Sequence, residues 1–306
     1  MNGVINVYKE RGYTSHDVVA KLRGILNMRK IGHTGTLDPD AEGVLAVCLG
    51  KGTRLVDMIT DYSKTYEAVM LLGTVTDTQD ISGNILETKE VHVSEVDIMD
   101  ACNSFIGEYA QIPPMYSALK HNGQKLYELA RKGVEVERKP RNITIKSLHI
   151  NDINLEDENK TVTFTVECSK GTYIRTLCQD IGEKLGCGAC MQKLTRTRVG
   201  QFGIDDSLTL NQISALCLKG EFEERVIAVD ELFSSYKKVT VLDEFAKLLY
   251  NGNKLGMNTV KQSEDLTVSD MEMYRIYDEN NRFIGVYRYE TDMFVPVKMF
   301  FDSSEL

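Results

Sequence analysis

The segment GHTGTLDPDAEG at residues 32–43 is glycine-rich and carries a carboxylate at its centre. Asp38 stands immediately before Pro39, and a proline disfavours the α region for its predecessor, so the backbone at Asp38 is predicted to be extended. A carboxylate held in one orientation suits a nucleophile or a base. An Asp-Pro pair is equally typical of a plain turn, and this loop alone leaves both interpretations open.

Three other loop chemistries fail on spacing. A Walker A loop needs G-x-x-x-x-G-K-[ST], which neither GHTGTLD nor LGKGTRL supplies. Asp38, Asp40, Glu42 and Gly43 imitate the start of an EF-hand loop, but its twelfth position is Leu49 instead of a glutamate. An aspartyl-phosphate enzyme also needs a magnesium site, and this loop makes none evident. We therefore expect no metal here.

Arg175, in SKGTYIRTL at residues 169–177, is the second candidate for chemistry. It lies where a predicted strand ends and a helix begins, and a cation near a helix N-terminus opposes the helix dipole. Stability alone would not select an arginine there, so we expect an anion beside it. That anion is a phosphate, a structural carboxylate or Asp38.

Two tyrosines and a histidine lie next to candidate polar residues. Tyr66 and Tyr173, taken singly, are typical of core or surface aromatics. A nucleic-acid base that stacks on an aromatic ring, however, contributes about 1 to 3 kcal/mol to binding. His33 lies in the loop between two small residues and has no partner visible in the sequence. These side chains are secondary candidates for contact with a base.

The elements that must position these residues alternate irregularly. Ser15 is predicted to cap a helix over residues 15–28 whose apolar residues share one face. The glycine-rich loop then leads into VLAVCLG at 44–50, a continuous apolar run that predicts a strand buried on both faces. Further helices are expected at 53–62, at 94–106 and after Gly171, with strands from residue 64 and at 161–169. This mixture favours an α+β domain over a doubly wound parallel sheet.

Length and composition bound the class of protein. With 306 residues, 42% of them hydrophobic, the chain is expected to form one large domain and a small one, divided near residues 232–240. The N-terminal segment resembles neither a signal nor a transit peptide, and no apolar run reaches the roughly 18 residues of a membrane span, so we expect a cytoplasmic protein. Seven scattered cysteines fit reduced thiols, and Cys187 and Cys190 form a lone CxxC without further metal ligands.

The net charge of −9 argues against a nucleic-acid partner, but the charge is unevenly distributed. Residues 120–146 hold eight basic and three acidic side chains, and Lys193, Arg196 and Arg198 form a second basic group. Residues 240–306 hold twelve acidic and seven basic side chains. Basic segments beside an acidic C-terminal region suit an RNA-binding protein, although a solvated helix face explains each run equally well.

Four segments together, in order and spacing, resemble the family of bacterial tRNA pseudouridine-55 synthases, the TruB type. The matching stretches are GHTGTLDPDAEGVLAVCLGKGTRL at 32–55, KTYEAVMLLGTVTDTQD at 64–80, QIPPMYSALKHNGQKLYELARKG at 111–133, and SKGTYIRTL with QKLTRTRVG at 169–200. The resemblance covers roughly the first 230 residues. One short motif is weak support, whereas four in sequence order are a strong signal.

The resemblance implies a role for each matching residue. Asp38 matches the catalytic aspartate, Tyr66 the active-site tyrosine that stacks on the target base, and Arg175 the arginine that pairs with the catalytic carboxylate. The substrate-binding positions that it implies are His33, Tyr173, Leu194 and, in the basic segment, Lys120 and Arg131. The family needs no cofactor. Whether the aspartate attacks C6 of the uracil, adds at C1′ of the sugar or allows a glycal intermediate is left open.

The resemblance also implies an architecture and a partner. Residues 1–235 would form an α+β pseudouridine synthase fold, a central mixed, mainly antiparallel sheet flanked by helices, with a T-arm-binding insertion near 105–145. Residues 236–306 would form a small β-rich PUA-like domain. The expected partner is the T-arm stem-loop of tRNA, with uridine 55 flipped out of its loop and the protein acting as a monomer. An RNA-binding or tRNA-folding protein and a metal-dependent hydrolase are the rival interpretations.

Overall fold

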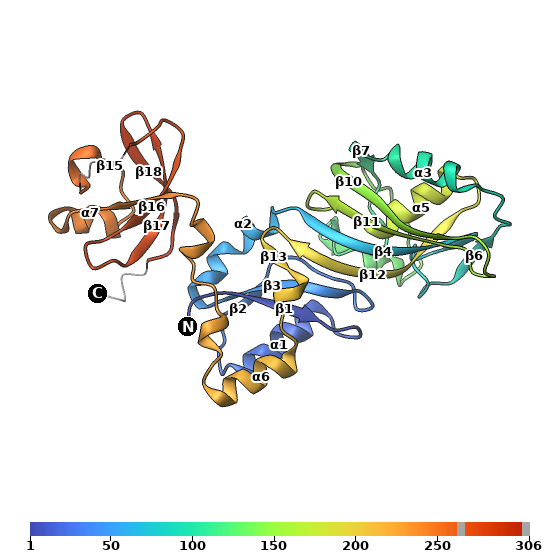
Figure 1. Ribbon diagram of the computed structural model, residues 1–306, viewed down its shortest axis with the longest axis horizontal. Helices are drawn as coiled ribbons and strands as arrows, with labels where there is room; N and C mark the ends of the chain where they lie inside the picture. The colour runs from blue at the N-terminus through green and yellow to red at the C-terminus, as the bar shows by residue number, and fades with distance from the viewer. Residues whose placement is uncertain (262–266, 302–306) are drawn as a thin grey trace.

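A computed structural model describes residues 1–261 and 267–301 of the chain. These residues form two sheets of different size, each with its own apolar core, with the smaller sheet at the C-terminal end (Figure 1). Helices flank the larger sheet, so the architecture is α+β, as predicted.

The larger sheet has nine strands, and its main path runs β1-β3-β12-β4-β11-β10-β7, while β2 pairs with β3 and β13 with β12. Neighbouring strands are antiparallel except β3 and β12, which are parallel, so the predicted mixed, mainly antiparallel sheet is confirmed. The strands are β1 (Gly3–Lys9), β2 (Ile31–His33), β3 (Glu42–Leu49), β4 (Lys64–Leu72), β7 (Gly107–Gln111), β10 (Arg141–Asn154), β11 (Thr161–Cys168), β12 (Ala189–Val199) and β13 (Phe202–Gly203).

Strand β3 follows from its sequence. All but its first residue are buried, because helices and loops cover both faces of the sheet at this position. The short strand β2 lies where the sequence predicts only loop. Its three residues pair with β3 through backbone hydrogen bonds. Such bonds do not depend on side chains, so a glycine-rich sequence does not predict them.

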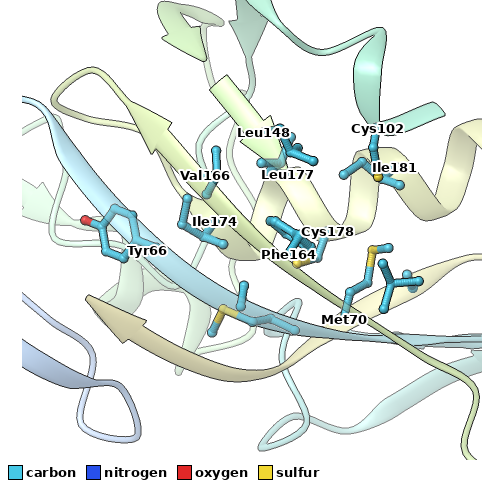
Figure 2. Packing of buried hydrophobic residues seen from close by; sticks show 14 of the residues in the cluster. Tyr66, Met70, Cys102, Leu148, Phe164, Val166, Ile174, Leu177, Cys178 and Ile181 are labelled. Carbon is cyan, nitrogen blue, oxygen red and sulfur yellow. The ribbon is translucent and has the colours of Figure 1, made fainter. Parts of the chain in front are cut away.

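The helices pack on the larger sheet in two groups. Helices α3 (Glu95–Asn103) and α5 (Ile174–Lys184) cover the half formed by β4, β10, β11 and β12, and α1 (Ser15–Ile25) and α6 (Leu210–Lys219) cover β1 and β3 (Figure 1). The remaining α-helices are short: α2 (Val56–Thr60), α4 (Leu126–Ala130) and α7 (Ala246–Tyr250). Figure 2 shows the core beneath α5, with Tyr66 at one end and its hydroxyl pointing away from the apolar side chains.

The predicted cap of the first helix is wrong by one residue. Thr14, not Ser15, is the N-cap: its side chain accepts a hydrogen bond from the Asp17 amide, and the Asp17 carboxylate accepts one from the Thr14 amide. Ser15 is buried and bonds to another segment of the chain. Both residues are good capping types, so their order in the sequence could not separate them.

The smaller sheet has five strands in the order β14-β16-β17-β18-β15. Its strands are β14 (Lys237–Thr240), β15 (Leu255–Gly256), β16 (Met273–Tyr277), β17 (Phe283–Glu290) and β18 (Met293–Met299). Val286 and Phe300 share an apolar cluster with Val4 and Val44, so the smaller sheet packs against the larger one.

Two small hairpins complete the described fold: β5 (Thr74–Thr76) with β6 (Ile85–Thr88), and β8 (Lys120–His121) with β9 (Gln124–Lys125). The second hairpin lies in the segment between β7 and β10. None of the helices within residues 1–261 and 267–301 has the length and apolarity needed to cross a membrane.

Candidate active site

The loop that carries Asp38 is held in place from both sides. The Leu37 amide donates to Ser15 Oγ at 2.9 Å, and Lys9 Nζ donates to the Pro39 carbonyl at 3.2 Å. Ser15 and Lys9 are both buried. The residues on either side of Asp38 are thus fixed to the start of α1 and the end of β1, while the Asp38 side chain stays 44% exposed.

Arg175 meets Asp38 at the first turn of α5. Its Nε lies 3.0 Å from Asp38 Oδ2, and its Nη1 lies 3.6 Å from Asp80 Oδ2. The same guanidinium donates to the Thr78 carbonyl at 3.0 Å and to the Tyr116 carbonyl at 2.8 Å. Two carboxylates, those of Asp38 and Asp80, therefore lie beside this guanidinium.

The two members of this ion pair differ in their exposure to solvent. The Arg175 side chain is 6% exposed and its donors have several acceptors, whereas the Asp38 carboxylate faces outward. A planar guanidinium suits such a cluster, because its donors are fixed in direction. The result is an immobile cation under a carboxylate that a substrate can reach.

Tyr66, on β4, closes the other side of this region. It is 9% exposed, and burial raises the pKa of its hydroxyl. Leu194, on β12, belongs to the same apolar cluster as Tyr66 and Leu37, the residue before Asp38. Tyr66 and Leu194 therefore belong to the apolar core that also contains the residue preceding Asp38.

The sequence places Arg196 in a basic group with Lys193 and Arg198, but in the structure its side chain is buried and does not lie on the surface. It is 2% exposed, pairs across the sheet with Tyr66, and donates to the Val44 carbonyl at 2.7 Å and the Gly35 carbonyl at 3.2 Å. Strand alternation turns its side chain inward, beneath the loop, and so removes it from the expected basic surface. Burial, reinforced by Arg196, lowers the pKa of the nearby Lys9 to about 8.

His33 ends β2 at the edge of this region. Burial, with the positive charge of neighbouring groups, lowers the pKa of its imidazole, so it is neutral at neutral pH. Its ring meets that of His16 edge to face, with centroids 5.6 Å apart, and its Nδ1 has no hydrogen-bond partner among the described residues.

Tyr173 is the N-cap residue of α5, two positions before Arg175, and burial raises the pKa of its hydroxyl. Its backbone pairs with the side chain of Gln111: the Tyr173 amide donates to Gln111 Oε1 at 2.8 Å, and Gln111 Nε2 donates to the Tyr173 carbonyl at 3.0 Å. The first turn of α5 is therefore bonded to the end of β7.

Lys120 and Arg131 lie on the segment between β7 and β10, and both are exposed. Lys120 is in the β8–β9 hairpin, and Arg131 follows α4 with its guanidinium 5.4 Å from the centroid of the Tyr127 ring. The segment reaches the site through Tyr116, whose carbonyl binds Arg175. These two cations are not part of the Asp38 cluster.

The CxxC pair does not form a reactive site. Cys187 and Cys190 are buried free thiols, and burial raises the pKa of Cys190 to about 11. Among the described residues, no three His, Cys, Asp or Glu side chains are grouped as a metal ion would require.

Sequence reasoning missed five residues that shape the site: Lys9, Ser15, Asp80, Gln111 and Arg196. The side chains of Lys9, Ser15, Gln111 and Arg196 form hydrogen bonds to backbone atoms that are distant in the sequence, so no local sequence pattern predicts these bonds. Asp80 is different, because it ends the matching stretch at 64–80 and, as an acidic residue there, was a visible candidate partner for Arg175.

Two protein-family models together match residues 23–238, which include most strands of the larger sheet. Residues 23–174 match the model of the TruB family pseudouridylate synthase N-terminal domain. Residues 175–238 match that of the tRNA pseudouridylate synthase B C-terminal domain. Asp38, Arg175 and the partners of the Arg175 guanidinium all lie within these two matches. Lys9 and Ser15, which hold the Asp38 loop, precede them.

Similar proteins extend over nearly the whole chain. The tRNA pseudouridine synthase B of Lachnoclostridium phytofermentans is 50% identical over 98% of this chain and 100% of its own length. That of Clostridium perfringens (strain SM101 / Type A) is 46% identical over 94% of each chain. Among solved structures, a chain of an H/ACA RNP bound to a substrate RNA containing 2′-deoxyuridine is 26% identical, with a TM-score of 0.69 over 98% of this chain and 85% of its own.

Proposed function

Because this chain belongs to the TruB family of pseudouridylate synthases and is a tRNA pseudouridine synthase, we propose that it isomerises uridine 55 in the T-loop of tRNA. The reaction takes place in the cytoplasm and uses no cofactor. Asp38 is the catalytic nucleophile. The observation that carries the assignment is the half-exposed Asp38 carboxylate held 3.0 Å from the buried Arg175 guanidinium.

The isomerisation needs a carboxylate and a closed pocket. The C1′–N1 glycosidic bond breaks, the uracil turns within the pocket, and a C5–C1′ bond forms while C5 loses a proton and N1 gains one. No electrons enter or leave, so acid–base groups and binding suffice. The Asp38 carboxylate supplies the nucleophile, and the guanidinium of Arg175 holds it in place at 3.0 Å.

Tyr66, Leu194 and Tyr173 form the pocket for the flipped uracil. Tyr66 supplies a ring on which the base stacks, and its hydroxyl, directed away from the apolar core, is placed for the transfer of the C5 proton. Extruding a nucleotide costs a few kcal/mol of stacking. His33, neutral and beside the loop, takes the space that the flipped base leaves.

The proposed T-arm-binding insertion lies near residues 105–145. Its part between β7 and β10, residues 112–140, carries Lys120 and Arg131, which contact the phosphates of the T-arm. Both cations are exposed, and phosphate contacts position an RNA without reading its sequence. We assign residues 1–235 to the catalytic domain and 236–306 to a small PUA-like domain. The relation to an RNA-bound H/ACA particle supports an RNA substrate for this architecture.

Replacing Asp38 by Asn tests the assignment. Asn keeps the size of the side chain but removes the anion, so we expect pseudouridine formation in a T-arm stem-loop to fall at least about 1,000-fold, while the dissociation constant for tRNA changes less than about threefold. Pseudouridine is mapped at each position of the transcript, which also tests the choice of uridine 55.

Asp40→Asn is the matched control, because Asp40 lies in the same loop, is exposed and pairs only weakly with Arg11 at 3.5 Å. It should retain near wild-type turnover. Undiminished pseudouridine with Asp38→Asn would refute the nucleophile. A variant that loses pseudouridine but still refolds denatured tRNA would show that the protein also assists tRNA folding.

A further inference from the structure

Gln111 is a buried polar side chain that the reaction described above does not use. It is 1% exposed and is the last residue of β7, directly before residues 112–140 of the proposed T-arm-binding insertion. Its amide makes both of its shorter bonds to the backbone of one residue, Tyr173, accepting at 2.8 Å and donating at 3.0 Å. These two hydrogen bonds resemble those between paired strands, but they join the end of β7 to the start of α5.

The start of α5 needs such support. Tyr173 has an extended backbone, and no side chain caps the helix there. Arg175, in the first turn, opposes the helix dipole, so it is unfavourable for the helix that carries it. The Tyr173 carbonyl already accepts the first helical bond, from Leu177, and Gln111 adds a second donor to the same oxygen.

A second bond joins the same two segments. The Tyr116 carbonyl, five residues into the segment after Gln111, accepts from Arg175 Nη2 at 2.8 Å. The strand that leads into the insertion thus holds α5 at its N-cap, and the insertion itself holds the arginine. Any shift of this segment on RNA binding would reach Arg175 through both bonds.

We propose that Gln111 is a positioning residue for catalysis, which locks the first turn of α5, and with it Arg175, to the strand entering the T-arm-binding insertion. The inference rests on the proposed function of Asp38 and Arg175. Gln111 touches neither the base nor the reacting atoms, so its loss should impair the chemical step more than RNA binding. A displacement of about 1 Å in a catalytic group can cost roughly 100-fold in rate.

The test compares Gln111→Glu and Gln111→Met in the full-length protein. Glu keeps the size and an acceptor for the Tyr173 amide but turns the donor into an acceptor facing the Tyr173 carbonyl, and Met removes both bonds. We expect the single-turnover rate at saturating T-arm stem-loop to fall about 10- to 100-fold in both variants. The dissociation constant for the same RNA should change less than about threefold.

Gln179→Met is the matched control, since Gln179 lies on the same helix and its amide donates to the Glu183 carboxylate at the exposed side of α5. It should keep the wild-type rate. Urea unfolding gives the folded fraction of each variant, to which rates are normalised, so that a folding defect is not counted as a catalytic one.

Wild-type single-turnover rates in both Gln111 variants, or a parallel loss of rate and affinity, would overturn the inference. Inactive wild-type protein would instead refute the proposed function, because the inference is tested only against a measurable wild-type rate.

Discussion

At the scale of single residues, the site combines exposed carboxylate chemistry with buried positive charge. Asp38 is the accessible member, while Arg175 and Arg196 are nearly fully buried and donate to backbone carbonyls. Buried guanidinium groups are costly unless their donors are satisfied, and here the loop and sheet supply acceptors. The positive charge therefore belongs to the scaffold, and the negative charge is what a substrate meets.

Asp180, on α5, allows a pH prediction at this scale. Burial, with the negative charge of Glu183, raises the pKa of its carboxyl from an ordinary value near 3.8 to about 7, and the Tyr109 hydroxyl donates to it. The folded protein then binds more protons than the unfolded chain between these values, so stability falls as pH rises from about 4 to about 7.

Asp180→Asn removes this titration. The free energy of unfolding of the wild type, measured with urea between pH 5 and 8, should decline relative to the variant as pH rises, and the difference should level off above about pH 8. Curves that stay parallel over this range would show that Asp180 has an ordinary pKa in the folded protein.

At the scale of elements, two adjacent residues at the start of α1, Thr14 and Ser15, have different roles. Thr14 closes a capping box, and Ser15 accepts a hydrogen bond from the Leu37 amide, next to Asp38. One side chain stabilises the helix, and the other fixes the loop that carries Asp38 to it. Similar hydroxyl residues thus have different consequences when they are lost.

Thr14→Ala should lower the free energy of unfolding by about 1 kcal/mol, the usual value for a lost N-cap, and leave turnover of the folded protein unchanged. Ser15→Ala leaves the Leu37 amide without its partner, which costs about 1 to 3 kcal/mol, and it should also slow turnover because the loop is released. Urea unfolding and single-turnover rates measure both effects. Equal turnover in the two variants would contradict the division of roles.

Particular elements show what could be predicted from the sequence. The buried strand β3 follows from an uninterrupted apolar run, and α5 from the spacing of its apolar residues. The polar contacts that hold the site could not be predicted, because Ser15 and Leu37 are 22 residues apart and Gln111 and Tyr173 are 62 apart. Such bonds depend on tertiary structure, and periodicity contains no information about them. Arg196 was misplaced for a different reason: the count of basic residues along the chain did not consider strand alternation, which turns this side chain inward.

At the scale of the whole molecule, a net charge of −9 coexists with an exposed basic segment. Lys120 and Arg131 lie on the insertion, whereas residues 240–306, with twelve acidic and seven basic side chains, account for five of the nine net negative charges. The charge that matters for RNA is local, since screening in physiological salt limits interactions to about 8 Å. An acidic protein can therefore bind a polyanion through one segment.

Binding to a T-arm stem-loop should weaken steeply as salt increases, because each phosphate contact releases counterions. Lys120→Ala and Arg131→Ala should each reduce the slope of log affinity against log salt by about one. Lys247→Ala, an exposed lysine on α7, is the control and should leave the slope unchanged. A flat salt dependence, or an equal effect of the control, would exclude the insertion as the phosphate-binding surface.

The parallel pairing of β3 with β12 has a consequence for synthesis of the protein. Asp38 is held by residues near the N-terminus, but Arg175 and the inward-facing Arg196 come much later in the chain. A nascent chain on the ribosome that has exposed only its first half lacks both arginines and the strand that β3 must join. Catalytic competence therefore arises late in translation, and the emerging polypeptide stays inert towards the tRNAs that crowd the ribosome producing it.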